Sequence, residues 1–365
     1  MSSYFDFCIL GAGLAGISLA YELSKEDVSV CLVDPAGVAA GASGTPLGLV
    51  NPATGRFASK SWEAELCYAK ILANLELIQD TSPVQFYKQT GVLRPAMDKK
   101  IASRMHENFR LQDWPEGWIE WKDEYKLTSF HPGINCVDGG VWLPIGLTVD
   151  ITTYLKSFAH YLSMQSIHQV YDKSYSLEKR TDFWELKFTS INSIKAKHVV
   201  FATGASTIQS EFWRGLPIHP VKGQLAVLEP ESPLNFGHAI SARGYIASLH
   251  STQFAVGSTY EHSFETEHTD QQGLDYLLDR FRKVLPDLHD NSKVVHQWAG
   301  IRASTPNRMP ILGKHPSHQT MSVFAGLGSK GTLYSAYLAE CMKDLLLKNI
   351  DVAKEVSINR LDFIT

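Results

Sequence analysis

Cysteine is scarce in this chain of 365 residues, and the spacing of the few cysteines does not match a disulfide or zinc motif. The sequence holds five, none in a C-x-x-C pair: Cys8, Cys31, Cys67, Cys136 and Cys341. An odd number without paired spacing argues against a disulfide framework or a zinc site and indicates a reducing compartment. Because Cys8 and Cys31 fall within apolar strand-like runs, we expect both to be buried as small hydrophobic side chains.

Long apolar runs and an excess of basic charge are also missing. No stretch reaches the roughly 20 apolar residues of a membrane span. The apolar N-terminus has no Lys or Arg before Lys25 and is interrupted by Asp6, unlike a signal peptide. The formal net charge of −4 argues against bulk attraction to nucleic acid or to an anionic membrane. We therefore expect a cytoplasmic protein with no membrane partner; its oligomeric state is left open.

Metal-ligand spacing is absent among the 14 histidines. His315 and His318 form an H-x-x-H pair, but Pro316 and Gln319 place it in a predicted loop. No H-E-x-x-H occurs, so no metal site is predicted.

The composition of the chain is an ordinary globular mixture, 44% hydrophobic and 20% charged. Its length favours two lobes over a single core.

A βαβ unit opens the chain. Residues 5–10 are typical of a short buried strand, and residues 17–24 carry apolar positions at helical spacing. Residues 28–33 form a second apolar run, which ends at Asp34. The turn between the first strand and the helix reads G-A-G-L-A-G, so strand, glycine-rich turn, helix, strand and terminal acid follow one another in about thirty residues.

The glycines of this turn predict a dinucleotide site. Gly11 permits the tight turn, Gly13 lets a pyrophosphate approach the backbone, and Gly16 lets helix and strand pack closely. The helix N-terminus attracts phosphates, and Asp34 is placed to accept the ribose hydroxyls, which disfavours NADP. NAD and FAD share this pattern. The residues expected to bind the cofactor here are Gly11, Gly13, Leu14, Ala15, Gly16 and Asp34.

Farther along the chain, periodicity predicts further helices and strands. Helices are expected at 62–79, 150–164, 271–285 and 332–348, and strands at 184–188, 198–202 and 321–325. Short alternating runs between 221 and 259 indicate an antiparallel sheet.

Three segments resemble the D-amino-acid-oxidase-like flavoproteins, a family that includes glycine oxidase and sarcosine oxidase. The first is G-A-S-G at 41–44, and the second is V-V-F-A-T-G-A-S at 199–206. The third runs from 298 to 313, with an Arg, a Thr-Pro and a Pro-x-x-Gly, and continues as G-L-G-S-K-G at 326–331. The resemblance touches both ends and the middle of the chain, whereas residues 83–142 match no motif.

The resemblance implies non-covalent FAD. The closing glycines open the last helix, whose N-terminus would stabilise negative charge on a reduced flavin. Covalent sarcosine-oxidase types use a Cys near the closing Arg, and residues 290–320 contain none. The further cofactor-binding residues implied are Ala42, Ser43, Gly44, Ala202, Thr203, Gly204, Arg302, Gly326, Gly328, Ser329, Lys330, Gly331 and Thr332.

The resemblance also implies two catalytic residues, Arg302 and Tyr245, that bind a substrate carboxylate. Arg suits this role because its planar fork pairs with both carboxylate oxygens and keeps its proton. Trp298 and Arg243 are candidates for lining the same pocket. Lys222 lies where relatives often carry another basic residue, and the alternative interpretation is a solvated charge.

The implied fold is α/β with an α+β second lobe. A Rossmann-like FAD-binding domain with a parallel sheet (residues 1–82, 143–218 and 299–365) is interleaved with an antiparallel-sheet substrate domain (residues 83–142 and 219–298).

The implied activity is oxidation of the C–N bond of an amino acid or N-substituted glycine. Hydride passes to flavin N5, the resulting imine hydrolyses, and dioxygen is the default acceptor, although oxidase and dehydrogenase are not separated. The leading substrate is a small amine or amino acid.

Three alternatives stay open. Segments 41–44, 244–247 and 329–340 resemble the oxidase half of a bifunctional bacterial enzyme that removes a carboxymethyl group from a modified tRNA wobble uridine. The acidic net charge disfavours this substrate. The basic residues from Arg94 to Arg110 could form a modest patch for tRNA phosphates, but they are interpreted as a solvated helix face. The others are a non-catalytic FAD-binding protein and a nicotinamide-dependent reductase.

Overall fold

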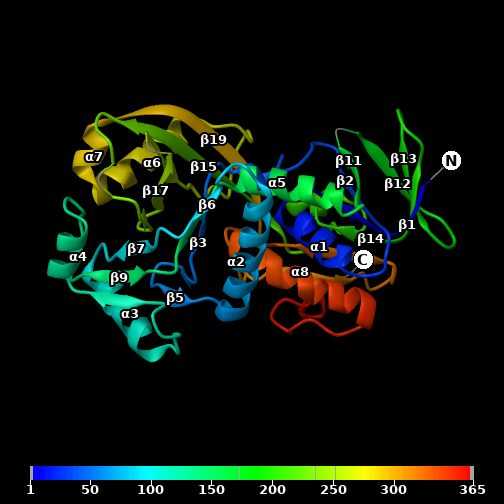
Figure 1. Ribbon diagram of the computed structural model, residues 1–365, viewed down its shortest axis with the longest axis horizontal. Coiled ribbons are helices and arrows are strands. Elements are labelled where there is room, and N and C mark those ends of the chain that lie inside the picture. Colours follow the sequence, from blue (N-terminus) through cyan, green and yellow to red (C-terminus); the bar gives the residue numbers. More distant parts are fainter. Residues whose placement is uncertain (1–2, 172, 235, 251, 362–365) are drawn as a thin grey trace.

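The computed structural model describes residues 3–171, 173–234, 236–250 and 252–361, and two lobes lie side by side along its longest axis (Figure 1). One is built around a mostly parallel sheet and the other around an antiparallel sheet. The first and last few residues of the predicted FAD-binding domain, 1–2 and 362–365, lie outside the described residues. Within the described residues no helix is long and apolar enough to cross a bilayer.

The first sheet gathers strands from the start, middle and end of the chain. Its order is β11-β2-β1-β14-β13-β12, and β21 adds to β14 in parallel, followed by β20. Strands β11, β2, β1 and β14 are parallel, while β12 and β13 form an antiparallel extension. The bounds are β1 (Ser3–Leu10), β2 (Val30–Asp34), β11 (His168–Tyr171), β12 (Tyr175–Lys179), β13 (Trp184–Phe188), β14 (Ile194–Phe201), β20 (Ile311–Lys314) and β21 (Met321–Ala325).

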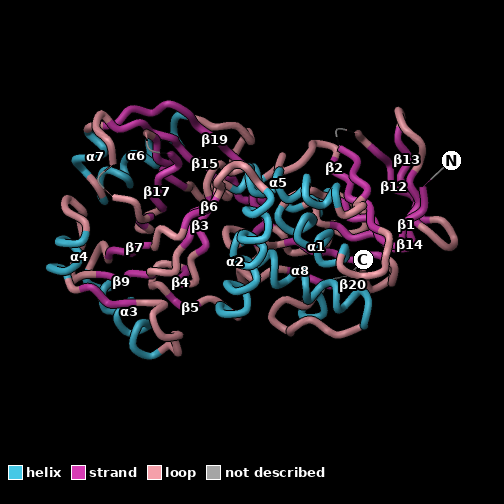
Figure 2. Tube along the Cα trace, in the orientation of Figure 1, coloured by secondary structure: helices cyan, strands magenta, loops and turns pink. Residues whose placement is uncertain are grey.

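Four helices pack against one another beside this sheet (Figure 2). They are α1 (Leu14–Ser24), α2 (Ala64–Thr81), α5 (Ile151–Met164) and α8 (Gly331–Lys348). Helix α1 is buried on nearly all sides, which is why its apolar residues are not confined to one face. The first and last helices of the chain thereby become neighbours.

The second lobe is an eight-stranded sheet of order β19-β15-β18-β17-β16-β7-β9-β8. All neighbouring pairs are antiparallel except β16 and β7. The bounds are β7 (Val92–Pro95), β8 (Glu120–Lys122), β9 (Gly140–Leu143), β15 (His219–Pro230), β16 (Ala239–Ile240), β17 (Tyr245–His250), β18 (Gln253–Gly257) and β19 (Ser292–Ser304). Residues 83–142, which match no motif, supply three of these strands.

Helices accompany this sheet, and short strands connect the lobes. Helix α6 (Gln271–Val284) packs on β15 and β18, with α7 (Pro286–Asp290) beside it, and α3 (Lys99–Leu111) and α4 (Glu124–Phe130) follow β7 and β8. Two small sheets complete the fold: β3 (Gly48–Val50), β10 (Leu147–Val149) and β6 (Tyr87–Lys88), and β4 (Ala53–Thr54) with β5 (Ser59–Lys60). Strand β19 runs unbroken through the proposed boundary at 298/299, and the domain limits stay a prediction.

Cys8 and Cys31 face each other across β1 and β2, and both are fully buried, as the sequence predicts.

Candidate active site

A cavity of about 2090 Å³ lies between the two sheets. Its lining comes from the β1–α1 turn, the loop at 41–45, the end of β14 and the start of α8, together with β15, β17 and β19. The structure thus brings together every predicted site residue except Gly16 and Gly44, which do not line the cavity. Trp298 and Arg243 line it as well.

Gly16 and Gly44 are required by packing. A Cβ on Gly16 would stand 1.8 Å from the carbonyl oxygen of Gly11, and one on Gly44 would stand 2.3 Å from the carbonyl oxygen of Ala39. Gly11 itself has φ +110°, and its Cβ would meet the carbonyl of Ala202 at 2.4 Å. The first turn therefore requires glycine at positions 11 and 16, and the loop at 41–44 requires it at position 44.

The groups at the end of β2 and the start of α1 suit a dinucleotide. The Asp34 carboxylate accepts the backbone N–H groups of Ala12 (2.7 Å) and Ala36 (2.9 Å), which hold it beside the turn. The Ser43 hydroxyl accepts the N–H of Leu14 at 3.1 Å, so the loop at 41–44 covers the start of α1. A glycine cradle, a fixed acid and a helix N-terminus fit the pyrophosphate and ribose of FAD.

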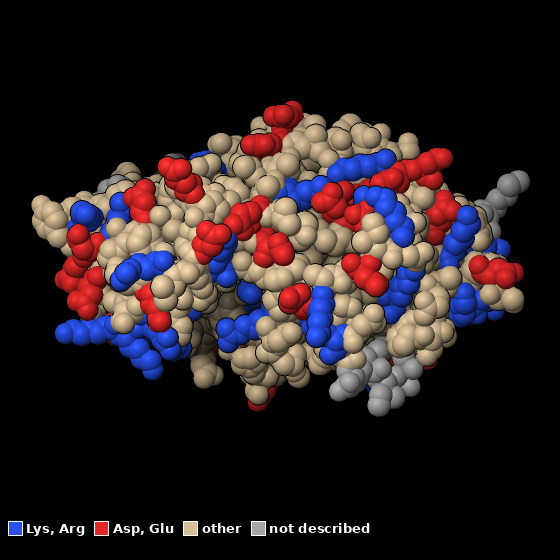
Figure 3. Space-filling view, turned by 90° about the horizontal axis from the view of Figure 1, so that it is seen from below, with Lys and Arg blue, Asp and Glu red and all other residues tan. Residues whose placement is uncertain are grey.

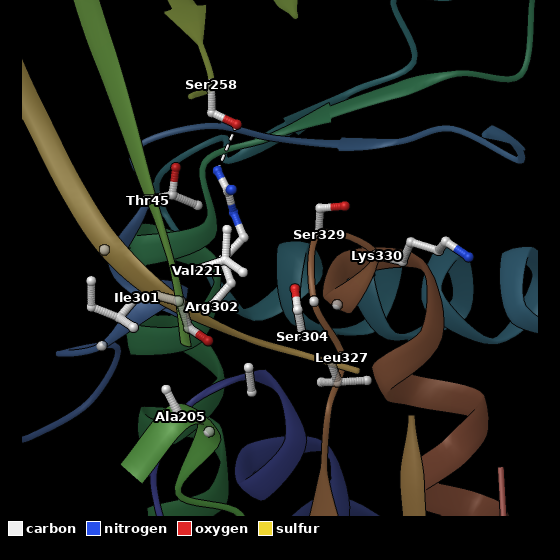
Figure 4. A pocket seen from close by; sticks show the side chains of 18 of the residues that line it. Thr45, Ala205, Val221, Ser258, Ile301, Arg302, Ser304, Leu327, Ser329 and Lys330 are labelled. Carbon is white, nitrogen blue, oxygen red and sulfur yellow. Dashed lines mark hydrogen bonds between the residues drawn. The ribbon is translucent and has the colours of Figure 1, made fainter. Parts of the chain in front are cut away.

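The closing glycines meet this turn from the other end of the chain. The N–H of Gly328 donates to the carbonyl of Ala303 (2.9 Å), and a Cβ on Gly331 would stand 3.0 Å from Leu14, so the starts of α1 and α8 converge. Lys330 points away from Arg302 (Figure 4). Its burial, with a contribution from the positive charge of Arg308, lowers the pKa of the Lys330 ammonium.

Arg302 lies on β19 with its guanidinium in the cavity wall. Its Nη2 donates to the Ser258 hydroxyl (2.6 Å, Figure 4), and its Nη1 donates to the carbonyl of Thr259 (3.1 Å). The guanidinium also stacks 4.6 Å from the ring centre of Tyr260. Among the described residues no carboxylate lies within 4.0 Å of it, so Arg302 is not a surface ion-pair partner. Its positive charge is available to an anion.

Tyr245 lies on β17, and its ring is packed beside the same cavity. The hydroxyl donates to the carbonyl of Leu47 at 3.1 Å, and burial raises the pKa of Tyr245 above its ordinary value. The side chain is therefore a neutral donor whose proton already has an acceptor. To bind a carboxylate it must exchange the Leu47 carbonyl for the substrate.

The prediction that Lys222 is a solvated charge is wrong. The side chain is fully buried on β15, and its Nζ pairs with Asp270 (2.5 Å) and Glu261 (3.4 Å). Burial alone would lower the pKa of Lys222, but the hydrogen bond to Asp270 and the two acidic charges raise it. In return, the hydrogen bond from Lys222 lowers the pKa of Asp270 to about 2.

Arg94 is likewise not part of a solvated face. It is buried on β7, where Nη1 donates to the carbonyl of Ala53 (2.6 Å) and Nη2 donates to that of Gly55. Burial lowers its pKa to about 10. The basic residues that do lie exposed on α3, as predicted, are Lys99, Lys100, Arg104 and Arg110.

The ring nitrogens of His315 are engaged by the backbone: one contacts the carbonyl of Phe212, and the other accepts the N–H of His318. Across the part of the chain that the structure describes, no three His, Cys, Asp or Glu side chains gather closely enough to hold a metal ion.

Comparisons with known proteins match nearly the whole chain. Residues 6–345 fit the sequence model of a family described as FAD dependent oxidoreductase. The chain is 26% identical over 377 residues to the tRNA 5-methylaminomethyl-2-thiouridine biosynthesis bifunctional protein MnmC of Leptospira interrogans, covering 93% of this chain and 57% of that protein. It therefore spans little more than half of that relative.

A second relative is matched over nearly its whole length. The chain is 22% identical over 356 residues to glycine oxidase of Geobacillus kaustophilus, covering 95% of this chain and 94% of that protein. The crystal structure of glycine oxidase from Geobacillus kaustophilus superposes with a TM-score of 0.85 at 21% identity, over 96% of both chains. This likeness establishes the shared fold.

Proposed function

The chain belongs to the family of FAD dependent oxidoreductases, and from this premise we propose that it oxidises the C–N bond of an amino acid or N-substituted glycine. The observation that carries the proposal concerns Arg302, whose guanidinium has no carboxylate partner among the described residues. It lies on the wall of the cavity that the dinucleotide turn also lines. A substrate carboxylate would neutralise this charge and fix the amine on one side of it.

The chain's own residues position the reaction. Arg302 binds the carboxylate through its fork, and Tyr245 adds a hydrogen bond once it leaves the Leu47 carbonyl. Neither group needs to exchange a proton in the reaction, because Arg keeps its charge and burial keeps Tyr245 neutral. The turn at 11–16, the loop at 41–44 and the start of α8 would hold the cofactor.

FAD, when bound, supplies the acceptor for two electrons. The substrate carbon loses a hydride and its nitrogen a proton, which leaves a C=N bond. Water adds to this bond, and C–N cleavage releases a carbonyl acid and an amine. Dioxygen is the proposed final acceptor, and its two-electron reduction gives hydrogen peroxide.

An anaerobic reduction screen tests the proposal. The FAD-loaded protein is mixed separately with glycine, sarcosine, proline, D-amino acids, an N-(carboxyalkyl)glycine and tRNA that carries the carboxymethylated uridine, and the oxidised flavin absorbance is followed. We expect bleaching by at least one small amine acid and much slower bleaching in Arg302→Gln. A protein that no member of the set bleaches contradicts catalysis on this class and favours a non-catalytic flavoprotein.

A second candidate substrate is the modified wobble uridine of tRNA. It is favoured by the 26% identity to the bifunctional relative, although the chain spans 57% of that protein. Basic side chains outnumber acidic ones in the cavity lining, although the chain as a whole is acidic; the basic ones are Arg56, Arg94, Arg214, Arg243, Arg280, Arg302, Arg308 and Lys330. Figure 3 shows one face hollowed between the lobes, with Lys and Arg at the hollow. Bleaching by tRNA but not by sarcosine, with a steep salt dependence, would establish this candidate.

A further inference from the structure

We propose that Arg94 forms a second anion-binding site in the substrate half of the cavity, so that the substrate carries an additional carboxylate or phosphate on its amine substituent. The inference rests on the proposed function and names the substrate class of the same site: an N-substituted glycine with an acidic N-substituent.

Arg94 carries a buried charge that nothing in the described chain neutralises. Its side chain is 6% exposed, and among the described residues no carboxylate lies within 4.0 Å of it. Two backbone carbonyls accept from Nη1 and Nη2, while Nε is buried without a partner. Asp98, an acid close in sequence, instead caps α3 by accepting the N–H of Ile101 (2.8 Å). A buried cation without a counter-ion is costly, and an anionic ligand would remove that cost.

The guanidinium stands on the same face of the sheet as the proposed carboxylate site. Val92, Tyr245 and Trp298 contribute to one hydrophobic cluster on this face. Side chains alternate along a strand, so Arg94, two residues after Val92, and Arg302, four residues after Trp298, also lie on it. Arg94 lines the cavity together with Thr54, Arg56 and Met97.

Strand spacing sets the distance to the second anion. Only β16 separates β17, which carries Tyr245, from β7, which carries Arg94. Two strand spacings place the backbones of β17 and β7 about 10 Å apart, and β19, which carries Arg302, lies three strands beyond β17. The carboxylate bound by Arg302 therefore does not reach Arg94, and the second acid must lie on the far side of the amine. Free glycine, sarcosine and proline have no such group.

Ligands that cannot be oxidised test this site without turnover. Octanoate, octanedioate and 7-phosphonoheptanoate each carry six methylene groups after the first carboxylate and differ only in the distal group. Each is titrated into the FAD-loaded protein, and its Kd is read from the flavin absorbance change. We expect both dianions to bind about tenfold or more tightly than octanoate, as a hydrogen bond to a charged group predicts. Their order distinguishes carboxylate from phosphate as the preferred distal acid.

Variants assign the preference to Arg94. In Arg94→Gln the advantage of the dianions should vanish while the Kd of octanoate changes less than twofold, and Arg94→Lys should keep part of it. Arg104→Gln is the matched control, because Arg104 is exposed on α3 in a pair with Glu107. If Arg94→Gln weakens the binding of all three ligands equally, Arg94 only holds the carbonyls of Ala53 and Gly55 in place, and the inference is overturned.

The wild-type protein decides the question even if the Arg94 variants do not fold, because equal affinity for octanoate and the two dianions overturns the second site. Failure of the proposed function looks different: octanoate then fails to bind, or binds equally well to Arg302→Gln.

Discussion

The guanidinium of Arg302 lies against the backbone of Gly223 on the neighbouring strand. A Cβ on Gly223 would come within 2.0 Å of Nη2 and 2.3 Å of Cζ of Arg302. The strand β15 thus provides a side-chain-free surface on which the guanidinium rests, between this glycine and the acceptors at Ser258 and Thr259.

Gly223→Ala should displace the guanidinium while leaving the sheet intact, because the clash is with the end of a flexible side chain. We expect the affinity for octanoate to fall about tenfold, the loss of one hydrogen bond to a charged group, with FAD content unchanged. The matched control is Gly237→Ala, where a Cβ meets nothing within 4 Å. Wild-type affinity in Gly223→Ala would mean that Arg302 does not bind the carboxylate from this position.

Arg302→Lys should abolish most activity although it keeps the positive charge. An ammonium cannot offer the paired, planar donors of the guanidinium, and its shorter reach misaligns the substrate. We expect kcat/KM to fall about 100-fold, close to 3 kcal/mol, with the oxidised flavin spectrum retained. Activity within twofold of wild type would remove Arg302 from the substrate site.

Lys222→Met should destabilise the substrate lobe. It leaves Asp270 and Glu261 without their shared cation, and Asp270 is 42% exposed, so the expected loss of about 2 kcal/mol lies below that of a fully buried pair. Urea unfolding measures it. In Lys222→Met/Asp270→Asn the effects should be less than additive, because both changes remove one interaction. Strict additivity would show that the pair does not stabilise the fold.

Acid should destabilise the protein through His238. Burial, and then the neighbouring His131, lower the pKa of His238 to about 4, whereas an unfolded histidine titrates near 6.5. The unfolded state therefore binds the proton more tightly, and stability present above pH 6.5 is lost as pH falls through about 4. In His238→Phe the melting temperature Tm should depend less on pH between pH 6.5 and about pH 4. Parallel profiles for the two proteins would exclude this histidine as the cause.

FAD should leave the protein when it is denatured. None of the five cysteines lines the cavity. Cys8, Cys31 and Cys67 are buried in the first lobe, Cys341 lies along α8, and Cys136 packs against a hydrophobic cluster of the second lobe. Acid precipitation is therefore expected to release all of the flavin to the supernatant. A pellet that stays yellow after washing would reveal a covalent link.

The order of elements along a short stretch of sequence was enough to predict the dinucleotide-binding turn and the strands around it. Strand, glycine turn, helix and acid follow one another within residues 5–34, so their spacing alone brings Asp34 next to the turn. The strands at 184–188 and 321–325 have the predicted bounds because each is a buried run between turns. The segment 83–142 gave no comparable signal, since its strands β6 to β9 have only two to four residues each.

The sequence by itself determined the turn that suits FAD, the buried strands and the arginine of the closing motif, because each of these is encoded by neighbours in the chain. Only the tertiary structure decided the state of Lys222 and Arg94. Their partners stand some 40 residues away, at Glu261, Asp270, Ala53 and Gly55. Whether a cation is solvated or buried depends on which strands pair and which loop covers them, and that is settled by long-range packing.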